Sequence, residues 1–81
     1  MDHVELFQKI EGQDANIVIS AQGTDIALEA NHIRISLEGV ITWNNNSISI
    51  DWEQSRIEED ADGFVISVND IVYSIMLKDA V

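Results

Sequence analysis

From residue 16 onward, apolar side chains recur at every second position, with polar or small residues between them. This alternation is typical of strands that have one face in a core and the other in solvent. The apolar positions are Ile17 and Ile19; Ile26, Leu28 and Ala30; Ile33, Ile35 and Leu37; Ile48, Ile50 and Trp52; Phe64, Ile66 and Val68; and Ile71, Tyr73, Ile75 and Leu77. The pattern predicts about six short strands within residues 16–78.

Residues that favour tight turns separate these runs. They are Gln22 and Gly23, Glu38 and Gly39, Asn44 to Asn46, Asp62 and Gly63, and Asn69 and Asp70. Connections this short cannot contain the crossover that parallel strands need, so neighbouring strands should pair antiparallel. We therefore predict a mainly β fold, an antiparallel meander curled into a small barrel or a two-layer sandwich.

Residues 2–11 have the pattern of a short amphipathic helix. Asp2 suits the N-cap, Glu5 completes a capping box, and Gly12 suits the position after the C-cap. The apolar face of this helix would consist of Leu6, Phe7 and Ile10. A first strand over the same residues is the alternative; as a helix, the segment would cover one open edge or end of the sheet.

Two predicted strands are apolar on both faces. Val18, Val72 and Met76 lie on the side opposite the predicted core. In a protein of this size such a surface indicates a covering helix or a partner subunit, so we expect a homodimer or higher assembly. Repulsion between acidic subunits opposes that association.

Composition narrows the class of protein. The chain has 81 residues, with 15 Asp and Glu against four Lys and Arg, a net charge of −11. Its length suits a single acidic β-rich domain over residues 1–81. The charge repels nucleic acids and anionic membranes and attracts basic surfaces, so we expect no direct nucleic-acid or membrane binding. Cysteine is absent and the N-terminus lacks a signal-peptide pattern, so we expect a cytoplasmic protein.

Six of the carboxylates fall within residues 51–62. The second half of this segment resembles the start of a calcium-binding loop, with Gly63 at the glycine position. Asn69, however, stands where the bidentate Glu is required, so we expect no metal site. The segment is instead interpreted as a solvated acidic hairpin loop in which Gly63 adopts a positive φ.

Carboxylates also form rows on the predicted strands, because residues two apart point to the same face about 6.6 Å from each other. A rigid β domain with such rows could occupy the basic groove of a nucleic-acid-binding protein. Trp52, beside the acidic segment, is either a core residue or an interface anchor. The predicted partner-binding residues are Asp51, Trp52, Glu53, Glu58, Glu59, Asp60, Asp62, Asp25 and Glu29.

No motif for catalysis or for a cofactor is present. His3 and His32 do not have metal-ligand spacing, and there is no phosphate loop or nucleophile elbow, so we expect a non-enzymatic protein without a cofactor. In size, charge and lack of a catalytic motif, the chain resembles the small acidic inhibitors of phages, anti-CRISPR and anti-restriction nucleic-acid mimics. That resemblance implies an inhibitor that docks on a basic, nucleic-acid-binding protein. The alternative is a structural or assembly protein, such as a phage particle component, that self-associates through an apolar β surface.

Overall fold

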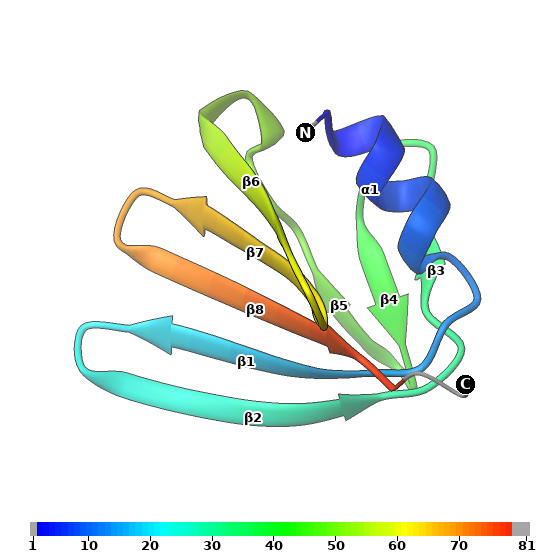
Figure 1. The fold of residues 1–81 in the computed structure, drawn as a ribbon, viewed down its shortest axis with the longest axis horizontal. Coiled ribbons are helices and arrows are strands. Elements are labelled where there is room, and N and C mark those ends of the chain that lie inside the picture. Colours follow the sequence, from blue (N-terminus) through cyan, green and yellow to red (C-terminus); the bar gives the residue numbers. More distant parts are fainter. Residues whose placement is uncertain (1, 79–81) are drawn as a thin grey trace.

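The computed structural model describes residues 2–78 as two packed layers (Figure 1). The elements in chain order are α1 (His3–Ile10), β1 (Ala15–Ala21), β2 (Thr24–Ala30), β3 (Arg34–Ile35), β4 (Ile41–Trp43), β5 (Asn46–Ile48), η1 (Trp52–Gln54), β6 (Ser55–Asp60), β7 (Gly63–Val68) and β8 (Ile71–Leu77). One layer is a five-stranded sheet in the order β2-β1-β8-β7-β6; the other comprises a small sheet, β3-β4-β5, and α1. All strand pairs are antiparallel, which confirms the predicted mainly β fold with a short N-terminal helix.

The five-stranded sheet opens like a fan, with β6 and β2 at its two margins (Figure 1). Because β1 pairs with β8, the first and last strands lie in the middle of this sheet and join the β1–β2 hairpin to the β6–β7–β8 meander. Neither helix of residues 2–78 is long and apolar enough to cross a membrane.

Helix α1 begins and ends where the sequence predicts. The Asp2 carboxylate accepts a hydrogen bond from the Val4 backbone N–H at 2.8 Å, and Gly12 follows the helix with a φ of 79°. Leu6 and Ile10, four positions apart, are fully buried. A helix of eight residues is too short to be stable alone, so this buried face is what holds α1 in place.

Tight turns close two of the hairpins. Gln22 and Gly23 have φ values of 51° and 81°, and Asn44 and Asn45 have 44° and 70°. Two consecutive residues with positive φ are characteristic of the type I′ turn, whose twist matches that of the flanking strands. Glycine and asparagine are the residues that adopt this conformation most easily, so the sequence predicts both turns.

The core lies between the two layers and is apolar throughout, with no buried polar or charged residue among those described. Its members are Leu6, Ile10, Ala15, Ile17, Ala30, Ile33, Ile41, Trp43, Ile48, Ile50, Ile57, Phe64, Ile66, Val68 and Ile75. Half of the predicted inward positions of the large sheet are in this set, and Ile19, Leu28, Tyr73 and Leu77 pack against it partly buried, on the side that the alternation predicts.

Two predicted strands are wrong in extent. Leu37 is fully exposed, because the Ser36 hydroxyl accepts hydrogen bonds from the N–H groups of Glu38 and Val40 and turns the chain out of the sheet. Trp52 does not continue a strand; it begins the 3₁₀ turn η1, in which Gln54 N–H donates to the Asp51 carbonyl at 3.1 Å. The residues described form eight strands, whereas the sequence predicts about six.

Candidate functional site

The acidic segment, residues 51–62, is not a single loop. It comprises η1, strand β6 and the turn into β7. Strand β6 pairs with β7 along its whole length, and Ile57, opposite Ile66, anchors it to the core. The predicted acidic loop is therefore wrong for residues 55–60, because a single buried residue and the backbone ladder are enough to hold this polar edge strand.

The alternation of β6 separates its carboxylates. Glu59 lies opposite Phe64 and shares the core-facing side, whereas Glu58, opposite Val65, lies on the outer side of the sheet. Asp60 is two positions after Glu58 and so lies on the same outer side, about 6.6 Å further along the strand. The Asp60 carboxylate accepts a hydrogen bond from the Ala61 N–H at 2.6 Å, which stabilises the turn.

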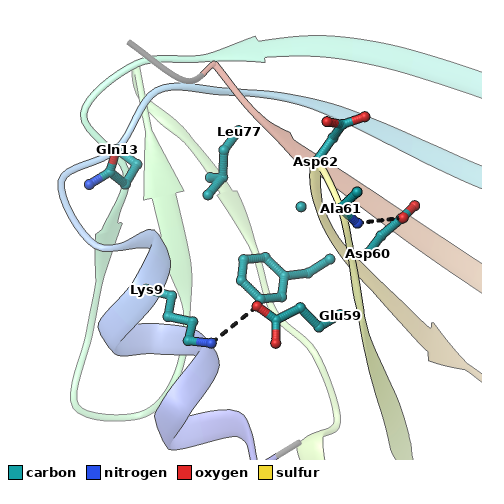
Figure 2. A pocket seen from close by; sticks show the side chains of 9 residues that line it. Lys9, Gln13, Glu59, Asp60, Ala61, Asp62 and Leu77 are labelled. Atoms are coloured by element: carbon teal, nitrogen blue, oxygen red, sulfur yellow. Dashed lines mark hydrogen bonds and ion pairs between the residues drawn. The ribbon is translucent and has the colours of Figure 1, made fainter. Parts of the chain in front are cut away.

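A hollow of about 340 Å³ lies between α1 and the β6–β7 turn (Figure 2). In Figure 2, Lys9 reaches from α1 to Glu59, and its Nζ donates to the Glu59 carboxylate at 3.1 Å. Asp60 and Asp62 stand on the β6–β7 side of the hollow, opposite Gln13. Of the three acidic residues that line the hollow, Glu59 is the one whose carboxylate is directed to the Lys9 ammonium group.

We define the β6 acidic edge as Glu58, Glu59, Asp60 and Asp62. All four side chains are exposed, and the only ion pair that involves them among residues 2–78 is that of Glu59 with Lys9. These residues lie on the β6–β7 hairpin. Strand β7 is also paired with β8 and contributes buried residues to the core, so the backbone beneath the charges is held in place. Such an arrangement presents a fixed patch of negative potential to a partner.

Asp51 and Glu53 lie away from this edge, at the other end of β6, which spans six residues or roughly 17 Å. Trp52 between them is half-buried and is not a free anchor. Its Nε1 donates to the Gly39 carbonyl at 2.9 Å, and its ring packs edge-on against Phe7 with centroids 5.0 Å apart. Trp52 therefore joins the 3₁₀ turn to α1 and packs, partly buried, against the core.

Asp25 and Glu29 lie on β2, at the opposite margin of the five-stranded sheet from β6. Four strand spacings of about 4.8 Å separate the two margins, or roughly 19 Å. Glu29 is paired with Lys78. The structure therefore divides the predicted partner-binding residues among three places and does not bring them together on one surface.

The outer face of the large sheet carries apolar side chains that are outside the core. Val18, Val65 and Val72 are half-buried there, and Met76 is 43% exposed. The positions of Val18, Val72 and Met76 opposite the core confirm the sequence prediction for these residues. Sequence analysis did not identify Val65, because it lies in a run where Phe64 and Ile66 dominate the alternation.

A second hollow, of about 510 Å³, lies beside the β4–β5 turn and is lined mainly by uncharged polar residues and by His32 and Arg34. Trp43 also lines it, and its Nε1 is buried without a hydrogen-bond partner among the described residues. This hollow contains no carboxylate, so it does not belong to the acidic surface. Residues 2–78 contain no group of three or more His, Asp or Glu side chains arranged to hold a metal ion.

Sequence analysis missed two partners of the acidic residues, Lys9 for Glu59 and Lys78 for Glu29. Each pair joins residues about 50 positions apart, and no local pattern signals such a contact. Comparison of the chain with protein-family models, curated proteins and solved structures gives no match.

Proposed function

We propose that the protein is a non-enzymatic binding protein that docks its β6 acidic edge on a basic surface of another protein. The observation that carries this proposal is the cluster of four exposed carboxylates on one sheet margin, where Lys9 and Arg56 are the basic residues beside them. Preorganised charge of one sign accelerates association with an oppositely charged surface and disfavours partners of the same sign.

Basic surfaces of this kind are typical of proteins that bind nucleic acids, so the favoured partner is a nucleic-acid-binding protein. Charges two apart on β6 are about 6.6 Å from each other, whereas one DNA strand carries a charge about every 3.4 Å of helix axis. The acidic edge therefore imitates the sign and rigidity of a nucleic acid more closely than its charge density. Occupying the partner's basic site would make the protein an inhibitor, in the manner of phage-encoded anti-CRISPR or anti-restriction mimics.

An assembly protein is the second candidate function. The observation in its favour is the apolar outer face of the sheet, with Val18, Val65, Val72 and Met76 outside the core. Burying these side chains against another copy would remove apolar area from water. Salt distinguishes the two functions, because screening weakens acidic docking and does not weaken apolar association.

The test of acidic docking compares two triple variants that remove the same charge. Glu58→Gln, Asp60→Asn and Asp62→Asn neutralise the β6 acidic edge; Glu11→Gln, Glu38→Gln and Asp70→Asn neutralise exposed carboxylates elsewhere. A partner is first captured with the immobilised protein from a nuclease-treated lysate of the native host. Its association rate with each variant is then measured by surface plasmon resonance over a range of salt concentrations.

We expect the edge variant to associate about tenfold more slowly than the starting protein and to show a flatter salt dependence, while the control variant changes by about twofold or less. Equal losses in both variants would mean that net charge matters and the edge does not. Salt-independent assembly into oligomers, unchanged by either variant, would favour the assembly protein.

A further inference from the structure

The two margins of the five-stranded sheet are protected to different degrees. Strand β6 has four charged residues among six, on both of its faces, and Lys9 from α1 lies against it. Strand β2 has seven residues, no proline, no lysine, and only two charged residues. Long edge strands without such protection are the ones that accept an additional strand.

The register shows which backbone groups of β2 face outward. Ala21 and Thr24 flank the two-residue turn, so they form a hydrogen-bonded pair, and alternate residues after Thr24 also bond to β1. The N–H and C=O groups of Asp25, Ala27 and Glu29 therefore point away from β1. No strand among residues 2–78 pairs with this side of β2. Three donors and three acceptors are thus presented in strand geometry.

An apolar shelf adjoins this edge on the core-facing side of the sheet. Ile26, Ile19, Tyr73 and Ile66 are consecutive neighbours across four strands. Ile66 is fully buried, Tyr73 and Ile19 are half-buried, and Ile26 is 51% exposed. The second layer therefore covers the sheet near β7 and leaves it open near β2, where Leu28 is also only half-buried. A strand added beside β2 would bury apolar side chains against this shelf.

The opposite side of β2 is acidic. Asp25 and Glu29 lie on the outer face with Ala27 between them. They are four residues apart along the strand, which corresponds to roughly 13 Å. Lys78 pairs with Glu29 but not with Asp25. An added strand would therefore encounter apolar side chains on one face and carboxylates on the other.

We propose that the outward edge of β2 binds an extended segment of another protein, as a sixth strand, in which apolar and basic side chains alternate. The apolar side chains pack on Ile26 and Leu28, the basic ones face Asp25 and Glu29, and the backbone bonds to residues 25, 27 and 29. This site lies at the opposite margin from the β6 acidic edge and does not depend on the function proposed there.

A second copy of the chain fits this edge less well. A two-fold pairing of β2 strands centred on Ala27 places Asp25 directly opposite Glu29 of the second copy, and like charges in that position are destabilising. Each copy also carries a net charge of −11. Charge complementarity therefore favours a basic segment.

The probe is the labelled peptide acetyl-Lys-Val-Lys-Ile-Lys-Val-Lys-amide, with acetyl-Lys-Lys-Lys-Lys-Val-Ile-Val-amide as a control of the same composition and charge. Binding is measured by fluorescence anisotropy. We expect the alternating peptide to bind at least about tenfold more tightly than the control, which corresponds to 1.4 kcal/mol. Equal binding of the two peptides would overturn the proposal, since it would reflect charge alone.

Two variants test the position of the peptide. Ala27→Pro removes an outward N–H that the sheet does not use, and proline is tolerated in edge strands, so we expect about a tenfold loss of affinity with the fold retained. The variant with Glu58→Gln, Asp60→Asn and Asp62→Asn should bind the alternating peptide within about twofold of the starting protein. A loss in this variant alone would place the peptide on β6 and overturn the proposal.

Amide hydrogen exchange locates the bound peptide in the unsubstituted protein. The N–H groups of Asp25, Ala27 and Glu29 should become protected when the alternating peptide binds, while those of β6 do not change. Protection of the same three groups without peptide, together with a dimer in light scattering, would assign the edge to a second copy and overturn the proposal. Failure at β2 would leave docking at β6 unaffected, because the two tests use different residues.

Discussion

Gly63 illustrates how much a single hydrogen atom in place of a methyl group can matter. A Cβ at this position would lie 1.9 Å from the Ile75 carbonyl oxygen, so no side chain fits where the start of β7 pairs with the end of β8. Gly23 differs in kind: its φ is 81°, and a Cβ there would have nothing within 4 Å. One glycine is required by space and the other by backbone conformation.

Alanine substitutions should separate these two requirements. Gly23→Ala should cost about 1–2 kcal/mol, the penalty of a left-handed conformation for an L-residue. Gly63→Ala should cost about 3 kcal/mol or more, because the β7 and β8 backbones must move apart. Thermal unfolding followed by circular dichroism measures both, with roughly 4–8 °C expected per kcal/mol in a domain of this size. A Gly63→Ala variant as stable as Gly23→Ala would contradict the steric explanation.

The positive φ predicted for Gly63 is wrong: among the glycines, positive φ occurs at Gly12, Gly23 and Gly39. An acidic residue followed by glycine suggests a turn, and the turn is indeed there, at Ala61 and Asp62. A close approach between strands depends on which strand lies alongside, and that information is not local.

At the scale of elements, helix α1 depends on tertiary contacts. Its N-cap is worth about 1 kcal/mol, whereas its two buried side chains are each worth several times more. His3 and Phe7 add aromatic contacts to Trp52, with centroids 5.7 and 5.0 Å away. The helix is therefore attached to the sheet layer through η1 as well as through the core.

Leu6→Ala should destabilise the protein by about 2–5 kcal/mol, because it leaves a cavity beneath α1. Val4→Ala is the matched control; Val4 is 49% exposed on the same helix, so a change within about 0.5 kcal/mol is expected. Urea denaturation monitored by tryptophan fluorescence measures both. Similar, small effects of the two substitutions would show that α1 contributes little to the stability of the fold.

The elements that the sequence predicts well are those in which local and long-range preferences agree. In β7 and β8, the inward Phe64, Ile66 and Ile75 alternate with smaller or more exposed residues, and the strands occur as expected. For the residues of β6 the sequence predicts a loop, because four of the six are charged and Ile57 is the one apolar side chain. An edge strand needs support on one side only, so its composition resembles that of a loop.

At the scale of the whole molecule, acidic residues greatly outnumber basic ones, 15 against four. The net charge is −11, and two lysine–carboxylate pairs, both exposed, are the ion pairs of residues 2–78 that do not involve histidine. Exposed pairs contribute about 0–1 kcal/mol each, so they do not offset the general repulsion among carboxylates. Sequence composition reveals this imbalance, but not that the β6 acidic edge lies at the opposite margin from Asp25 and Glu29, since strand order is a tertiary property.

Salt should therefore stabilise the folded protein. Raising NaCl from about 0.01 M to about 1 M shortens the screening length from roughly 30 to 3 Å, and the melting temperature should rise by several degrees. A variant that combines the six Gln and Asn substitutions described for the docking test should melt higher at low salt and respond less to salt. Calorimetry checks both, and a melting temperature that falls with salt would mean that attractive pairs dominate.

The central pairing of β1 with β8 determines when the fold can be completed during protein synthesis. Its partners are at least 50 residues apart in the sequence, so the β1–β2 hairpin is synthesised before β8, its neighbour in the sheet. Until then, the side of β1 that pairs with β8 has no strand beside it, and an isolated hairpin is only marginally stable in water. The entropy of closing so long a loop must be lost before the β1–β8 contacts form, so we expect folding on the millisecond-to-second scale of non-local β proteins. The nascent chain thus remains open to chaperones, and to other nascent copies, until β8 has emerged.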